Sequence, residues 1–192
     1  MAKESTFSGM LITLLLITLL SSVALGYVYE LTREPIAVAK MAKKNMAIKK
    51  VTPAFANNPV DDVFSVPSDG DSLYLYPAKD SSGAVIGYAI ETFSNIAFSG
   101  SIKLLVGFLP EGNIKEIAVL EHKETPGLGD KMMKSKSDFS YQFEGKNPAS
   151  FVLKVKKDGG DVDAITAATI SSRAFCDAVQ RAYNVLPKGG TQ

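Results

Sequence analysis

The stretch Ile102–His122, "IKLLVGFLPEGNIKEIAVLEH", decides the fold class of this 192-residue chain. Two runs rich in β-branched and other apolar residues, 102–110 and 114–122, flank the short segment "EGN". Within that segment Gly112 suits a backbone with positive φ, as a tight turn requires. The stretch therefore predicts a β-hairpin.

The same kind of pattern lies on both sides of this hairpin. Residues 72–78 and 84–93 flank the turn-rich segment "KDSSG" and predict a second hairpin. Residues 151–157, "FVLKVKK", predict a fifth strand.

The C-terminal part predicts a helix from about Thr169 to Leu186. Its apolar residues recur at helical spacing, and they are Ile170, Ala174, Phe175, Ala178, Val179, Ala182 and Val185. Antiparallel strands followed by a helix make an α+β domain. We expect this domain over residues 72–187, with residues 188–192 as a tail.

The N-terminal part predicts a membrane anchor. The residues from Ser5 to Tyr29 contain no charge, and the run "MLITLLLITLLSSVAL" within them is almost entirely apolar. A helix over residues 8–29 would be about 30 Å long, which is enough to cross a bilayer. The alternative is a cleaved signal peptide, because Ala24-Leu25-Gly26 resembles a cleavage site. The length of the apolar run favours an uncleaved single transmembrane helix, preceded by a tail of residues 1–7.

Residues 30–71 predict an amphipathic helix that begins near Pro35, followed by a linker. Several lysines follow the predicted span, namely Lys40, Lys43, Lys44, Lys49 and Lys50. Residues 52–71 contain three prolines and six acids or asparagines, which is typical of an irregular connection.

The composition excludes several classes of chemistry. With 21 basic and 20 acidic residues, the net charge of +1 gives no bulk attraction for nucleic acid. The chain has one cysteine, Cys176, and one histidine, His122. An internal disulfide and a metal site of several Cys and His ligands are therefore excluded. A Ser-His-Asp centre would have to use His122.

Two stretches remain as candidates for a functional site. Residues 121–132, "EHKETPGLGDKM", pass the histidine and enter a turn whose glycines would let the backbone approach a flat ligand closely. The alternative interpretation is a structural turn with an exposed histidine.

The second stretch, residues 163–175, "DAITAATISSRAF", places several small hydroxylated residues at the start of the predicted final helix. Capping by Thr166 or Thr169 would explain one of these hydroxyls. It explains neither the threonine pair nor Asp163 ahead of it.

Both stretches resemble the motifs of one family. Asp163–Thr169, "DAITAAT", resembles the D-x-x-(S/T)-G-A-(T/S) signature of the FMN-binding domains in Rnf-type and Na⁺-translocating NADH:quinone complexes. His122–Gly129, "HKETPGLG", resembles the family's H-x-E-T-P-G-L-G stretch. In size and order the chain is similar to the G subunits of Rnf-type complexes. Ala167 stands where the signature has glycine, and its methyl group would be strained if φ were positive.

The resemblance implies a covalent flavin. In the family the last hydroxyl of the signature is esterified to the phosphate of FMN by a separate flavin transferase. Here that residue is Thr169, and Asp163 would serve recognition by the transferase. The other motif residues are implied to surround the cofactor, and they are Thr166, Ala167, Ala168, His122, Glu124, Thr125, Gly127, Leu128 and Gly129.

The resemblance also implies a place in the cell and a set of partners. The chain would be a membrane-anchored electron-transfer subunit of an ion-translocating ferredoxin/NAD oxidoreductase, catalytically incomplete alone. Its partners would be the other subunits, the flavin transferase and membrane lipid. The lysines after the span favour a cytoplasmic domain by charge count. The resemblance implies the outer, periplasmic side of the cytoplasmic (inner) membrane, which we expect because long folded domains translocate despite their charge.

A function of another class remains open. A membrane-tethered domain could bind a small ligand noncovalently, as a sensor does. Aromatic residues of the predicted strands would then line the pocket, namely Tyr74, Tyr76, Tyr88, Phe93 and Phe98.

Overall fold

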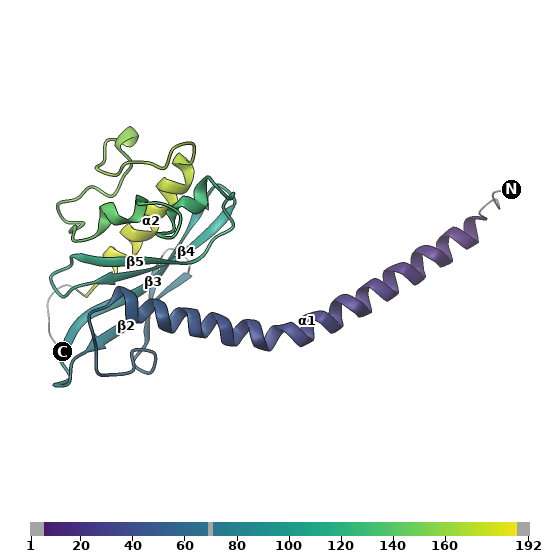
Figure 1. The fold of residues 1–192 in the computed structure, drawn as a ribbon, viewed down its shortest axis with the longest axis horizontal. Helices are drawn as coiled ribbons and strands as arrows, with labels where there is room; N and C mark the ends of the chain where they lie inside the picture. Colours follow the sequence, from purple (N-terminus) through teal and green to yellow (C-terminus); the bar gives the residue numbers. More distant parts are fainter. Residues whose placement is uncertain (1–5, 69–70, 188–192) are drawn as a thin grey trace. The chain divides into compact units, whose positions relative to one another are not determined.

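The computed structural model describes residues 6–68 and 71–187, shown as a ribbon in Figure 1. The chain divides into two compact units, of which the first ends at Lys43 and the second begins at Lys44. The described part of the first unit consists almost entirely of helix α1 (Phe7–Val51), whose last eight residues belong to the second unit.

Helix α1 is one continuous helix, and Pro35 lies inside it rather than at the start of a second helix. Strong helix formers such as Ala, Lys, Met and Leu dominate the residues after the predicted span, and they outweigh the hydrogen bond that a proline removes. Among the described residues, α1 is the helix long and apolar enough to cross a membrane, and its most apolar window is fully exposed. This supports a single-pass membrane anchor.

The second unit is built on a sheet whose strands follow one another in chain order. In the described ranges the sheet has five antiparallel strands, β1 (Phe64–Ser68), β2 (Asp71–Lys79), β3 (Val85–Ala97), β4 (Gly100–Phe108) and β5 (Ile114–Glu121). The pairs β2–β3 and β4–β5 are the two predicted hairpins, and Gly112 has a φ of 89°. Helix α2 (Thr169–Asn184) follows, so the predicted α+β class is confirmed.

The fifth strand does not lie where the sequence predicts it. Within the described chain, residues 151–157 contain only a single-residue bridge, Val155 to Val162, and the start of a 3-10 turn, η3 (Lys156–Asp158). The segment is irregular, but the side chains of Leu153 and Val155 are buried while their neighbours are exposed. This gives the same alternation of buried and exposed residues as a strand. The missing strand is β1, inside the stretch predicted as a linker.

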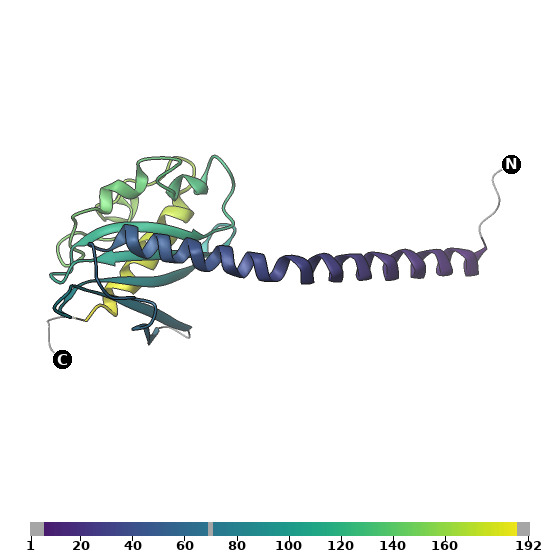
Figure 2. The same ribbon diagram turned by 60° about the horizontal axis from the view of Figure 1, so that its bottom comes forward.

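The two faces of the sheet carry separate cores, because successive side chains of a strand point to opposite faces. On one face Leu104 and Val106 of β4 pack with Phe175 and Val179 of α2. On the other face Leu105 joins a smaller core with the last turn of α1. In Figures 1 and 2 the yellow helix α2 lies along the sheet, beside the green segments that connect it to β5.

Polar side chains fix the middle of α2 and the last residues of α1 to the sheet. On β3, the Thr92 hydroxyl donates to the carbonyl of Ala178 over 2.8 Å, and the Ser94 hydroxyl donates to Asp177 over 2.7 Å. Two of the lysines after the predicted span are paired with sheet residues. Lys44 lies 2.9 Å from Glu91, and Lys50 lies 3.2 Å from Glu116.

Candidate functional site

One cavity brings the two candidate stretches together. It has a volume of about 330 Å³, near the lower end of the range for small-molecule sites. It is lined by Phe98, Glu124, Thr125, Leu128, Gly129, Ala167, Ala168, Thr169, Ile170 and Ser171. The loop after β5 therefore forms one wall, and the start of α2 forms another.

The N-terminus of α2 opens onto this cavity. Thr169 is the first residue of the helix, and among the described residues no side chain caps it at Ala168. The first N–H groups of a helix lack acceptors within the helix and carry the positive end of its dipole. An anion such as a phosphate is favoured at this position. The half-buried side chain of Thr169 lies at this helix end and lines the cavity.

Ala167, two residues before Thr169, has a φ of 59°. This is the left-handed region, where an alanine costs about 1–2 kcal/mol relative to glycine. The glycine of the family signature therefore corresponds to a backbone requirement, and Ala167 meets it with strain. Ala167 itself is exposed, so the strain is in its backbone and not in its packing.

Two buried serines explain the remaining hydroxyls of the opening of α2. The hydroxyl of Ser172 accepts the N–H of Ile165 over 2.9 Å and donates to the carbonyl of Ala168 over 3.0 Å. The hydroxyl of Ser171 donates to Glu124 over 2.5 Å. These serines hold the preceding loop and the β5 loop against the helix.

His122 lies beside the cavity and not in its lining. Its Nδ1 accepts the N–H of Glu124 at 3.2 Å, which assigns the proton of the neutral ring to Nε2. Nε2 lies 3.1 Å from the sulfur of Met133. Gly127 also lies outside the lining, with a φ of 80° in the turn that carries Leu128 over the cavity.

Asp163 and Thr166 lie at a different hollow from Thr169. That hollow is also lined by Gln142 and Ser137. The amide of Gln142 bonds the backbone of Asp163 twice, accepting its N–H at 2.8 Å and donating to its carbonyl at 3.1 Å. The exposed carboxylate of Asp163 pairs with Lys156 over 2.7 Å. Both side chains therefore face solvent.

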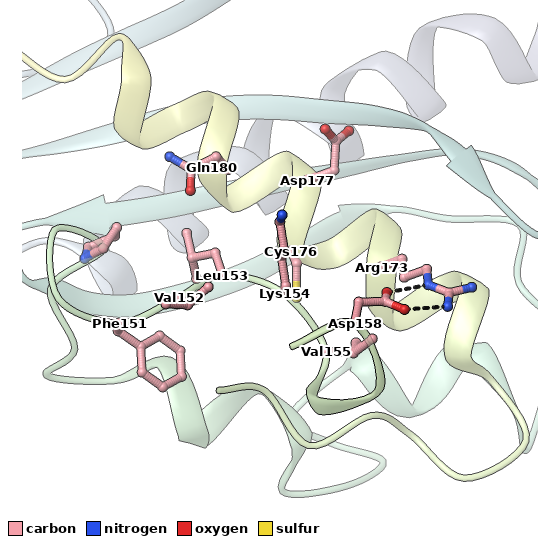
Figure 3. Close-up of a pocket in the computed structure, with 11 residues that line it drawn as sticks. Phe151, Val152, Leu153, Lys154, Val155, Asp158, Arg173, Cys176, Asp177 and Gln180 are labelled. Atoms are coloured by element: carbon pink, nitrogen blue, oxygen red, sulfur yellow. Dashed lines mark hydrogen bonds and ion pairs between the residues drawn. The ribbon is translucent and has the colours of Figure 1, made fainter. Parts of the chain in front are cut away.

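A larger hollow, of about 580 Å³, lies on another side of α2 and is shown in Figure 3. Arg173 donates two hydrogen bonds to Asp158, at 2.6 and 2.7 Å, and this partner holds the pKa of the Asp158 carboxyl below its usual range. Burial raises the pKa of the Cys176 thiol to about 12. Neither candidate motif contributes to this hollow, whereas residues of both line the smaller cavity. We therefore assign the functional site to the smaller cavity.

The motifs that predict the site leave out three residues of the cavity. Ile170 and Phe98 are exposed, at 44% and 69% of their surface, and Ser171 is buried. The two adjacent serines directly after the signature could have indicated Ser171, because a hydroxyl on the buried face of a helix needs a hydrogen-bond partner. Of the aromatics proposed for a ligand pocket, Phe98 is the one in the described lining of this cavity.

Comparison with known proteins identifies relatives that match most of the chain. The model of the FMN-binding domain family matches residues 98–184, which include both candidate stretches. The G subunit of an ion-translocating oxidoreductase complex from Haemophilus influenzae is 33% identical over 178 residues, which are 88% of this chain and 85% of that protein. The corresponding G subunit of Stutzerimonas stutzeri is 34% identical over 182 residues, 92% of this chain and 79% of that protein.

A third relative, the G subunit of Pseudomonas aeruginosa, is 33% identical and covers 93% of this chain and 89% of its own length. Among solved structures, NqrC of Shewanella oneidensis superimposes with a TM-score of 0.43 at 21% identity. That alignment covers 72% of this chain and 64% of that chain, and it is too distant for comparison of individual residues.

Proposed function

The chain belongs to the G subunits of ion-translocating oxidoreductase complexes, and on this premise we propose that it carries electrons through an FMN attached covalently to Thr169. It contains an FMN-binding domain, and its N-terminal helix indicates a membrane anchor. The attachment, the residues around the flavin and the side of the membrane are the parts that we propose.

The observation that carries the proposal is the position of Thr169. It is the signature hydroxyl that lines the cavity, at the helix end that suits a phosphate, whereas Thr166 lines the solvent-facing hollow. The residues around Thr169 fit the cofactor, because the cavity combines a polar helix end with the apolar side chains of Phe98, Leu128 and Ile170. These exposed side chains would contact a flat aromatic ring.

Each group of residues would have a distinct task. The N–H groups at the start of α2 would hold the phosphate, and Thr169 would fix it in place. Thr125 and the Pro126–Gly129 turn would form the wall against the ring. Bound FMN would supply the one- and two-electron chemistry, while the protein would set its position and its electrostatic surroundings. Gly127 and His122 would act on the flavin only through this turn.

The maturation step would use the other hollow. Asp163 and Thr166 are exposed there, close in sequence to the attachment residue, so a flavin transferase could contact them without entering the cavity. The other subunits of the oxidoreductase complex would exchange electrons with the flavin at the exposed rim of Phe98 and Ile170. We place this domain on the periplasmic side of the cytoplasmic membrane.

The test is co-expression of the full chain with a flavin transferase, followed by fluorescence on a denaturing gel and intact mass. We expect wild type and Thr166→Ala to retain a covalent flavin and Thr169→Ala to lose it. Thr169→Ser should retain some, because it keeps the hydroxyl. A fluorescent Thr169→Ala together with a dark Thr166→Ala would move the attachment to Thr166. A wild-type chain that binds FMN only reversibly would favour the noncovalent ligand-binding domain instead.

A further inference from the structure

We propose that Glu124 is a positioning residue that joins three walls of the flavin cavity and thereby fixes the direction of Thr169. The inference rests on the proposed function in one respect, which is the role of Thr169 as the attachment residue. It assigns to Glu124 a task within the protein, in place of a contact with the cofactor.

The carboxylate of Glu124 is buried, with 6% of the residue exposed, and both of its oxygens have protein partners. Oε1 accepts the backbone N–H of Ser99 at 2.9 Å, and Oε2 accepts the hydroxyl of Ser171 at 2.5 Å. Ser99 lies in the connection between β3 and β4, directly after Phe98 of the lining. One side chain therefore holds the β3–β4 connection, the loop after β5 and the first turn of α2.

Gly129 shows how closely these segments approach one another. A Cβ atom at this position would overlap Oε2 of Glu124 and would lie 2.6 Å from the hydroxyl of Ser171. Gly129 is not among the residues with positive φ, so the backbone conformation does not require glycine. Glycine is required because the Glu124–Ser171 pair occupies the space of a side chain.

The pair acts on Thr169 through the geometry of the helix. Ser171 lies two residues after Thr169 in the same first turn, and each residue of an α-helix is rotated by about 100° from the last. Holding the Ser171 hydroxyl against Glu124 therefore fixes the rotation of the turn and keeps Thr169 facing the cavity.

The chain offers a matched control for this pair. Ser94 also donates a hydrogen bond to a carboxylate on α2, reaching Asp177 over 2.7 Å, and neither residue lines the cavity. Ser94→Ala thus removes a serine–carboxylate bond to the same helix without touching the attachment turn. Glu124→Gln is the conservative variant, because its carbonyl can accept from Ser99 and its NH₂ can donate to Ser171.

The experiment measures the initial rate of covalent FMN incorporation into the full chain by a flavin transferase, for wild type, Glu124→Gln, Glu124→Ala, Ser171→Ala and Ser94→Ala. Hydrogen exchange is measured on the same proteins before flavin is added, for the amides of residues 172–175, which donate to the carbonyls four residues earlier and so report on the first turn of α2. We expect Glu124→Ala and Ser171→Ala to slow incorporation about tenfold and to speed exchange in that turn. Glu124→Gln and Ser94→Ala should stay close to wild type in both measurements.

Three results would overturn the proposal. Wild-type rates and exchange in Glu124→Ala and Ser171→Ala would show that the pair positions nothing. A Glu124→Gln variant as slow as Glu124→Ala would show that the charge acts directly. Slowing of Ser94→Ala equal to that of Ser171→Ala would indicate a general effect of stability. If wild type takes up no covalent flavin, the proposed function fails, while the exchange data still decide the role of Glu124.

Discussion

The backbone of Gly107, near the end of β4, lies so close to the carbonyl group of Val51, the last residue of α1, that no Cβ atom fits between them. Around this contact Ile48 and Val51 pack against the sheet. The ammonium of Lys115 on β5 donates hydrogen bonds to two carbonyls at the end of the helix, that of Lys50 at 3.1 Å and that of Thr52 at 2.5 Å. The end of α1 is therefore held against the sheet by close packing as well as by charge.

Gly107→Ala should destabilise the second unit by about 1–3 kcal/mol, because a methyl group there forces the last turn of α1 away from the sheet. The measurement is thermal or chemical unfolding of the full chain in detergent. Ser101→Ala, at an exposed position of the same strand, is the control and should unfold like wild type. An unchanged midpoint for Gly107→Ala would mean that the helix end shifts without cost.

Ala167→Gly should stabilise the protein by about 1 kcal/mol, because glycine removes the strain of a φ of 59°. The effect is read as a shift in the denaturant midpoint. Ala164→Gly in the same loop has no positive φ to relieve, so it should be neutral or destabilising. If both glycine variants lower the midpoint, the loop before α2 does not hold Ala167 in the left-handed region.

In Glu116→Gln the free energy of unfolding should fall less steeply with pH in the acid range than it does in wild type. Burial acts to raise the pKa of Glu116, but its bonds to Lys134 and Lys50 outweigh burial and hold the pKa below the ordinary value of 4.5. A lowered pKa contributes stability that is present above pH 4.5 and is lost as the pH falls through the pKa of the folded state. The wild type should therefore exceed Glu116→Gln in stability at neutral pH and lose this advantage below pH 4.5.

Unfolding midpoints from pH 7 down to about pH 3 test this, since the range covers the ordinary carboxyl pKa values. Glu111→Gln, which removes an exposed charge in the β4–β5 turn, is the control and should follow the wild-type curve. Parallel curves for wild type and Glu116→Gln would contradict the prediction.

A cysteine at position 81 should react with a membrane-impermeant maleimide in spheroplasts before lysis, because we place the flavin domain on the periplasmic side. Ser81 is exposed in the β2–β3 turn. The native Cys176 does not need to be removed, since it is 2% exposed and burial raises its pKa to about 12. Labelling of Ser81→Cys only after lysis would place the domain in the cytoplasm.

The sequence predicted those parts of the fold that depend on local pattern. Both hairpins follow from runs of strand-forming residues around short turns, and α2 follows from apolar residues at helical spacing. The strand β1 was missed because it is short, lies at the edge of the sheet and contains Pro67, as a connection would. Residues 151–157 were misassigned because the burial of alternate residues in a loop has the same period as a strand.

The sequence predicted the two stretches that form the candidate site, but not which of their residues contact one another. Motif resemblance could select Thr169 and the turn Pro126–Gly129. The bond between Ser171 and Glu124 joins residues 47 positions apart, so it exists only through the packing of α2 against the sheet. The φ of Ala167 is likewise set by the loop that Ser172 holds, and no local preference of alanine indicates it.

The burial of Cys176 protects its thiol from oxidation. Because burial raises the pKa of the thiol to about 12, Cys176 is protonated at neutral pH, and the thiolate is the form that oxidants attack. In the proposed electron-transfer role the chain would lie beside carriers that can leak electrons to oxygen, where an accessible thiol would accumulate sulfenic acid or mixed disulfides. Because the one cysteine of the chain is buried, Cys176 presents no reactive sulfhydryl and needs no thiol repair.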